Sequence, residues 1–107
     1  MSAASTMKCT GASGTQYEFE LYPWNTVWRP VPVVYVVLRH DGAQWKVLYV
    51  GETGDVKQRF ANHERQPCFD RHLKTHLAVR QETSAVRRTA MEKDIMKNYN
   101  PPCNREI

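Results

Sequence analysis

The segment VVYVVLRHDGAQWKVLYVG, residues 33–51, decides the fold of this chain. Its β-branched and aromatic residues over 33–38 predict a strand that is buried on both faces. Asp41-Gly42 is a typical turn pair, and the apolar run from Trp45 to Val50 predicts the returning strand of a β-hairpin. Gly51, directly after that strand, allows a close approach of other groups to the backbone.

Before the hairpin, the sequence signals for secondary structure are weaker. Residues 1–16 are rich in Ser, Thr, Ala and Gly without periodicity, which predicts a flexible N-terminal tail. Residues 17–21 alternate apolar and polar side chains and predict a short strand. Three prolines then break the chain around Trp24 and Trp28. We therefore expect a single domain over residues 17–107.

After the hairpin the pattern becomes helical. Asp55 is placed to cap a helix over residues 56–64, and Gln66-Pro67 is expected to end it. A second short helix over 68–76 and a third strand over 77–80 follow. Ser84 is a plausible cap for a last helix that runs to about Tyr99. The order predicts an α+β fold (α/β in the broad sense): a small, mostly antiparallel three-stranded sheet flanked by helices, with an N-terminal extension.

Composition restricts the class of protein. The chain has 107 residues, which suits one domain. The longest uncharged apolar run, residues 31–38, is too short to cross a bilayer, and the first residues lack the apolar stretch of a secretory signal. We expect a soluble, cytoplasmic protein. Its cysteines, Cys9, Cys68 and Cys103, are odd in number and widely spaced, so we expect free thiols in a reducing compartment.

The positive charge is concentrated in the second half of the chain. The net charge is +4 in total, and residues 57–97 hold ten Lys and Arg against five Asp and Glu. This excess of +5 indicates a polyanionic partner such as nucleic acid. A solvated basic surface that serves solubility is the alternative.

Glu92 stands out on the last predicted helix, because it lies in the middle of the apolar stripe that contains Ile95. Burying an unpaired carboxylate costs several kcal/mol. Either Arg88, four residues earlier, pairs with it, or Glu92 binds a metal ion. His72 and His76 are also four residues apart, but no third ligand is evident, so a zinc site is not predicted there.

Several of these residues form one series. Arg59 and His63 are four residues apart on a predicted helix and so project from one face. The order and spacing resemble the GIY-YIG nuclease family, and in particular the nuclease domain of the bacterial excision-repair incision enzyme. The resemblance covers residues 33–104, although Val33-Val34-Tyr35 replaces the Gly-Ile-Tyr of the family. The residues that carry it are Tyr35, Tyr49-Val50-Gly51, Arg59, His63, Glu92 and Asn104.

The resemblance implies a metal-dependent endonuclease that hydrolyses phosphodiester bonds, and we expect DNA to be the substrate. Glu92 would hold one Mg²⁺ (or Mn²⁺), Arg59 would bind phosphate oxygens, and Asn104 would position the C-terminal segment. Tyr35 or Tyr49, with His63, would activate water. A homodimer or a partner protein would supply specificity. Five further cations are expected to contact phosphates: Lys46, Lys57, Arg65, Arg71 and Lys74.

Two other functions stay open at this level. The chain could be a nucleic-acid-binding module of the same fold that has lost cleavage, which the altered first motif permits. It could also be a protein whose basic half binds an acidic protein partner. The first predicts binding of nucleic acid without metal-dependent nicking, and the second predicts no steep loss of DNA affinity with added salt.

Overall fold

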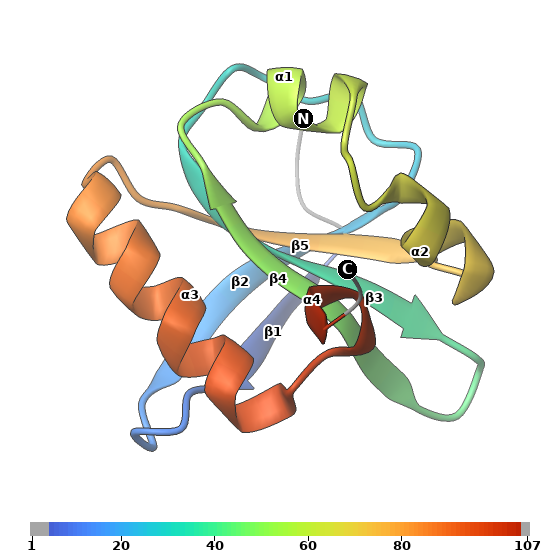
Figure 1. The fold of residues 1–107 in the computed structure, drawn as a ribbon, viewed down its shortest axis with the longest axis horizontal. Coiled ribbons are helices and arrows are strands. Elements are labelled where there is room, and N and C mark those ends of the chain that lie inside the picture. Colours follow the sequence, from blue (N-terminus) through green and yellow to red (C-terminus); the bar gives the residue numbers. More distant parts are fainter. Residues whose placement is uncertain (1–4, 106–107) are drawn as a thin grey trace.

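The computed structural model describes residues 5–105 and has an antiparallel five-stranded sheet in the order β1-β2-β5-β3-β4 (Figure 1). Its strands are β1 (Ser5–Thr10), β2 (Gln16–Pro23), β3 (Val33–His40), β4 (Trp45–Thr53) and β5 (His76–Gln81). Its helices are α1 (Val56–Ala61), α2 (Gln66–Arg71), α3 (Ala85–Tyr99) and α4 (Pro102–Arg105). The α+β class is confirmed, and the prediction of three strands is wrong.

Two strands extend the predicted sheet: β2, which contains the short strand expected over residues 17–21, and β1, which comes from the predicted tail. Residues 5–10 form β1, which pairs with β2 along its whole length and buries Cys9 completely. The turn that follows is held to α3, because the Asp94 carboxylate accepts hydrogen bonds from Ser13 and from the Tyr17 hydroxyl at 2.7 Å. The prediction of a flexible tail is therefore wrong over residues 5–16, and residues 1–4 lie outside the described part of the chain.

Strand β3 is buried on both faces, as its composition predicts. Val33, Tyr35 and Val37 belong to one apolar cluster, together with side chains of α1, α2 and α4. The alternate residues of β3 belong to a second cluster, to which α3 contributes Ile95. Each fully buried aliphatic or aromatic side chain contributes about 1.5–3 kcal/mol relative to an exposed one, so β3 anchors both clusters.

The helix caps follow the sequence signals. Asp55 caps α1 by accepting a hydrogen bond from the Gln58 amide at 3.0 Å, and Ser84 caps α3 through the Arg87 amide. Helix α1 ends at Ala61, earlier than predicted, and α2 begins at Gln66. Gln66-Pro67 starts a helix instead of ending one, because proline is compatible with the first turn. His76 lies in β5, beyond this helix.

Helices α2 and α4 are joined by a disulfide between Cys68 and Cys103. The expectation of free thiols is wrong for these two cysteines, which lie 35 residues apart in sequence, and it is confirmed for Cys9. Burial raises the pKa of the Cys9 thiol to about 11. Within the described residues, no helix is long and apolar enough to cross a membrane.

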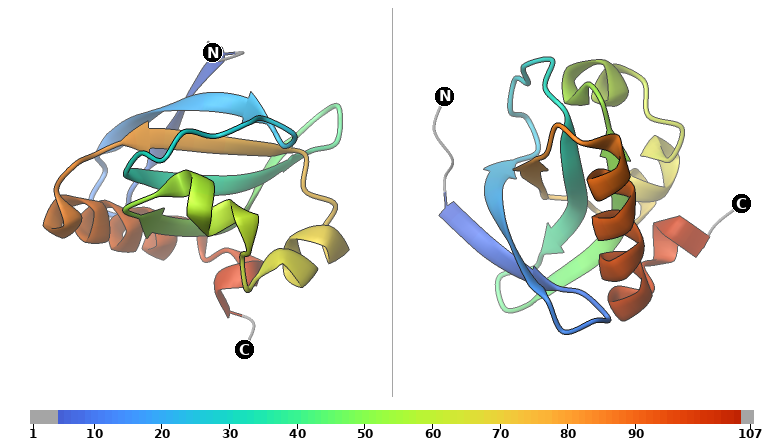
Figure 2. Two further views of the ribbon diagram at one scale, coloured as in Figure 1. Left: turned by 90° about the horizontal axis from the view of Figure 1, so that it is seen from above. Right: turned by 90° about the vertical axis from the view of Figure 1, so that its left-hand side faces the viewer.

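The position of β4 matters for function. It is an edge strand, and α3 and α4 both contact it (Figures 1 and 2). Helix α1 follows the end of β4 almost directly. Side chains from three helices therefore meet beside the strand that contains Tyr49 and Gly51.

Candidate active site

The hairpin positions the two tyrosines of the predicted site. Tyr35 on β3 pairs with Gly51 on β4, and Val37 pairs with Tyr49. Tyr35 and Tyr49 are therefore diagonal neighbours on one face of the sheet, where long side chains make contact. Their rings lie 6.0 Å apart at an interplanar angle of 27°.

Gly51 provides the space for this arrangement. A Cβ atom at this position would lie 2.5 Å from Cζ and Oη of Tyr35 and 2.9 Å from Cε2 of Tyr49. Both contacts are shorter than van der Waals distance, so a larger residue would displace the Tyr35 ring. The Tyr35 hydroxyl consequently lies directly over the backbone of β4.

The Tyr35 oxygen is the centre of a hydrogen-bond network. It lies 2.8 Å from Nε2 of His63 and receives a hydrogen bond from Nε of Arg59 at 3.4 Å. The other ring nitrogen of His63, Nδ1, accepts a hydrogen bond from the Arg65 amide at 3.0 Å. A neutral imidazole has one protonated nitrogen, so this acceptor role puts the proton on Nε2. His63 therefore donates to Tyr35, and the phenol oxygen accepts two N–H donors.

Burial sets the protonation of this network. Desolvation, followed by the positive charge of Arg59, lowers the pKa of His63 to about 4, so the ring is neutral at pH 7. Desolvation and the neighbouring Tyr49 raise the pKa of Tyr35 well above its ordinary value, and Arg59 opposes this shift. In the free protein at neutral pH, Tyr35 is thus a phenol beside a neutral histidine.

Arg59 connects this network to solvent. It lies in the last turn of α1, with 27% of its side chain exposed, and its Nη2 lies 3.2 Å from the Glu64 carboxylate. Partial burial lowers the pKa of Arg59, but hydrogen bonds to Tyr35 and Glu64 outweigh this effect and raise it overall. His63 lies beyond the end of α1, so the prediction that it shares a helix face with Arg59 is wrong, yet both side chains reach Tyr35.

Glu92 approaches the same strand from α3. Its carboxyl is half-buried, and its pKa is raised by desolvation and then by the negative charge of Glu52 on β4. Its own charge contributes to the raised pKa of Tyr35. This effect of Glu92 on Tyr35 is smaller than the effects of burial, Tyr49 and Arg59.

The suggested helix pair between Arg88 and Glu92 does not form. Arg88, 8% exposed, donates from Nε to the Glu52 carboxylate at 2.8 Å and from Nη1 to the carbonyls of Glu82 and Thr83. Arg88 therefore forms its ion pair with Glu52, and Glu92 is the carboxylate whose pKa is raised. The sequence analysis missed Glu52 and the role of Arg88. The position of Glu52 directly after Tyr49-Val50-Gly51 was the available signal.

The Asn104 side chain forms hydrogen bonds with the backbone of β4. Its Oδ1 accepts a hydrogen bond from the Val50 amide at 2.8 Å, and its Nδ2 donates to the Val50 carbonyl at 2.9 Å. These are the groups that an edge strand leaves without a strand partner. The Asn104 side chain thus takes the place of a neighbouring strand and holds α4 against the segment between Tyr49 and Gly51.

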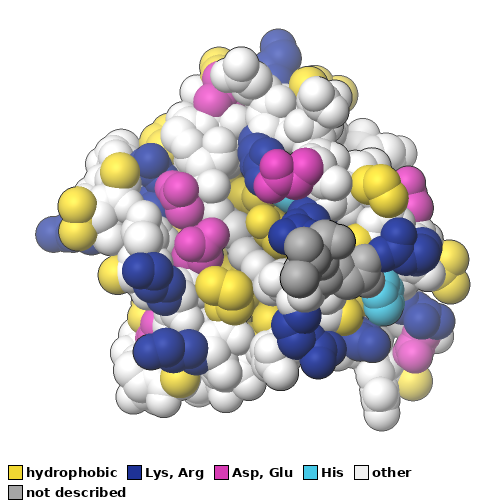
Figure 3. Space-filling model, in the orientation of Figure 1, with side chains coloured by type: hydrophobic (Ala, Val, Ile, Leu, Met, Phe, Trp, Pro, Cys, Tyr) yellow, Lys and Arg dark blue, Asp and Glu magenta, His cyan; other side chains and the backbone are white. Residues whose placement is uncertain are grey.

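The five predicted phosphate-contacting cations lie on several elements of the structure. Figure 3 shows Lys and Arg side chains around the middle of one face, interspersed with acidic ones. Lys74 donates to Asp70 at 2.6 Å and lies over the Trp24 ring. Its charge is therefore already paired within the protein. The exposed members are Lys46 on β4, Lys57 on α1 and Arg71 on α2, while Arg65 is half-buried before α2.

Comparison of the chain with protein-family models, with curated proteins and with solved structures found no match. What this protein does is inferred from the residues around Tyr35 and Glu92.

The contact between Gly51 and Tyr35 yields a stability prediction. Gly51→Ala should lower the free energy of unfolding by about 1–3 kcal/mol, because the new methyl group overpacks against Tyr35. Gly54→Ala is the matched control: its Cβ would meet Arg88 at an ordinary 3.9 Å, and we expect a change within about 0.5 kcal/mol. Urea unfolding measures both. Equal stability of the two variants would contradict the close approach.

The neutral state of His63 yields a pH prediction. Its pKa is lowered from 6.5 to about 4 on folding, so the unfolded chain binds more protons between these values. The free energy of unfolding should therefore fall as the pH drops from 6.5 to 4. In His63→Gln this contribution disappears, while titration of the carboxylates is retained. Urea titrations at several pH values measure the difference in slope, and identical slopes would show that His63 is not buried in its neutral form.

Proposed function

We propose that this protein is a metal-dependent endonuclease that hydrolyses phosphodiester bonds of nucleic acid, with DNA as the substrate, by the type of site that GIY-YIG nucleases use. The observation that supports it best is the Tyr35 oxygen, which accepts hydrogen bonds from His63 and Arg59. Phosphodiester hydrolysis needs an activated water, positive charge at the phosphoryl oxygens and stabilisation of the leaving oxygen.

Arg59 is the residue that we assign to the phosphate. A guanidinium stays charged at all relevant pH values and binds two phosphate oxygens with its planar fork. In the free protein its outward nitrogen is bound to Glu64, whose side chain is 70% exposed. The scissile phosphate replaces this carboxylate when nucleic acid binds, so Glu64 competes with the substrate.

Tyr35 is the tyrosine that we assign to the proton of the attacking water. Two N–H donors at one oxygen stabilise the phenolate relative to the phenol. Burial has the opposite effect and keeps the phenol protonated in the free protein. The rate of hydrolysis should therefore increase towards alkaline pH. Tyr49, which stacks on Tyr35, is assigned to positioning the nucleic acid and the Tyr35 ring.

Glu92 has the properties of a ligand for a hard divalent cation. A carboxylate that is half-buried beside the Glu52 carboxylate is destabilised by desolvation and repulsion, and a bound cation relieves both. Mg²⁺ keeps most of its waters and needs one or two protein carboxylates. When bound there, Mg²⁺ or Mn²⁺ would supply Lewis-acid stabilisation of the phosphoryl and leaving oxygens.

Plasmid nicking tests the proposal. Wild-type protein should convert supercoiled plasmid to open circles with Mg²⁺ and not with chelator, and Glu92→Gln should lower the rate at least about 100-fold, the scale of losing one electrostatic contributor. Glu18→Gln, an exposed glutamate on β2 with the same change of charge, is the control and should cut normally. Circular dichroism checks that both variants fold.

Other outcomes separate the alternatives. Salt-sensitive DNA binding without nicking by the wild type would favour a binding module that has lost cleavage. Absence of salt-sensitive binding would favour an acidic protein partner. Nicking by Glu92→Gln at the wild-type rate would show that Glu92 is not the metal ligand.

Competition by Glu64 gives a separate prediction. Glu64→Gln should tighten DNA binding by about 1.5- to 5-fold, because an exposed ion pair is weak and its loss leaves Arg59 available to phosphate. Glu18→Gln makes the same change in net charge away from Arg59 and should have a smaller effect. Fluorescence anisotropy with a labelled duplex and no metal measures both. If the two variants bind equally, Glu64 does not shield Arg59 from phosphate.

A further inference from the structure

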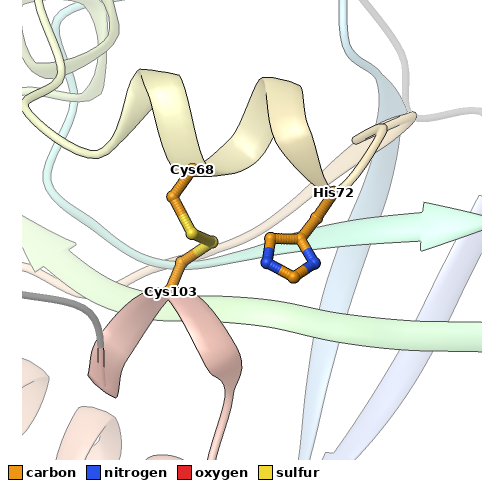
Figure 4. Close-up of side chains that lie close together, drawn as sticks. All are labelled: Cys68, His72 and Cys103. Atoms are coloured by element: carbon orange, nitrogen blue, oxygen red, sulfur yellow. A yellow bond between two sulfur atoms is a disulfide. The ribbon is translucent and has the colours of Figure 1, made fainter.

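A second group of potential metal ligands lies apart from the tyrosine network. Cys68 and His72 are four residues apart, in α2 and at its C-cap, and Cys103 faces them from α4 (Figure 4). The two Sγ atoms and a ring nitrogen of His72 all lie within 4.8 Å of one another. Cys68 and Cys103 are 3% and 0% exposed, and His72 is half-buried.

These distances fit a tetrahedral zinc ion after a small movement. Zinc binds thiolate at about 2.3 Å and imidazole at about 2.0–2.1 Å, so its tetrahedral ligands lie about 3.6–3.8 Å from one another. The Cα atoms of the two cysteines are 5.8 Å apart. Side-chain rotation within that spacing separates the sulfurs once their bond is broken, and His72 is already within reach.

The kinds of ligand also select the metal. Two thiolates and an imidazole are soft or borderline ligands, which favour Zn²⁺ over Mg²⁺. Within residues 5–105 the group contains three such ligands, so a water or an external ligand would complete a tetrahedron. The spacing of Cys68 and His72 by one helical turn is suitable for two ligands of one ion.

We propose that Cys68, His72 and Cys103 form a redox-controlled zinc site. A dithiol reductant transfers two electrons and two protons to the disulfide, giving two protein thiols and an oxidised reductant. Zinc then binds the two sulfurs and a ring nitrogen of His72, and two thiol protons are released to solvent. A disulfide oxidant reverses the sequence: it accepts two electrons from the two thiolates and two protons from solvent and becomes a dithiol, zinc is released, and the Cys68–Cys103 bond forms again.

The site would connect α2 to α4 in both redox states. Cys103 directly precedes Asn104, whose side chain holds the backbone of Val50 on β4. A disulfide or a zinc ion therefore keeps α4 against the sheet, while the reduced, metal-free protein loses this link. Zinc binding should accordingly raise the melting temperature of the reduced protein and leave that of the oxidised protein unchanged.

Metal binding to the full chain tests the proposal. The protein is reduced with dithiothreitol, freed of it by gel filtration under argon, and mixed with Zn²⁺ or with Co²⁺. We expect one tightly bound zinc per reduced chain, and with Co²⁺ the thiolate charge-transfer absorption and visible bands of tetrahedral coordination. The oxidised protein should bind neither metal at this site, because disulfide sulfurs are not thiolate ligands.

Two histidine variants make the test specific. His72→Ala keeps both cysteines and should weaken zinc binding by the reduced protein at least about 10-fold, on the scale of losses that follow changes around metal sites. His76→Ala removes a histidine of β5 that is outside the group and should bind zinc like the wild type. Because both variants retain the disulfide for folding, they do not depend on the stability of a cysteine variant.

The results either support or overturn the site. Reduced wild-type protein that binds no zinc would overturn it and leave Cys68–Cys103 as a structural disulfide. Equal zinc affinity of the His72→Ala and His76→Ala variants would also overturn it. Both experiments measure zinc binding and not nucleic-acid cleavage, so their outcome is independent of the proposed nuclease activity.

Discussion

Strand β3 is buried on both faces, and this constraint determines where the rest of the molecule lies. It pairs with β4 on one side and β5 on the other, and its alternating side chains anchor two apolar clusters. Tyr35 introduces a hydroxyl into this otherwise apolar strand. A buried hydroxyl requires hydrogen-bond partners, which His63 and Arg59 supply. The need of this buried hydroxyl for hydrogen-bond partners therefore places His63 and Arg59 around the Tyr35 oxygen.

The edge position of β4 leaves backbone groups without a strand partner, and a side chain from another element binds them. The free backbone groups of β4 at Val50 are satisfied by Asn104, and the helix that holds Asn104 is fastened to α2 through Cys103. At the end of β4, the buried guanidinium of Arg88 pairs with the Glu52 carboxylate. Desolvation and the charge of Glu52 raise the pKa of the Glu92 carboxyl, although Lys93 and a hydrogen bond from the Glu52 backbone oppose this shift, and a cation would stabilise its ionised form. The proposed magnesium ligand and the proposed zinc site thus lie on elements that the same edge strand organises.

Much of the local structure is encoded in neighbouring residues. The hairpin, the caps at Asp55 and Ser84 and the doubly buried β3 follow from composition and spacing within a few residues. The contact between Tyr35 and Gly51 does not follow from the turn alone, because a β-bulge between Val37 and Leu38 shifts the register of β3 against β4 by one residue. Strand β1 was missed because Ser, Thr and Lys make up most of it and leave no apolar run, and its stability comes from pairing with β2 and from contacts of the following turn with α3.

Local sequence patterns are sufficient to predict the strands of the hairpin, the starts of α1 and α3, and the set of residues that resembles a nuclease site. The tertiary structure decided which of those groups interact: the Tyr35 network, the pairing of Arg88 with Glu52 across 36 residues, and the disulfide. Propensity and capping act over one or two turns of chain, so they can be read locally. Ion pairs, tautomers and thiol pairing depend on the distance between segments that only the folded chain brings together.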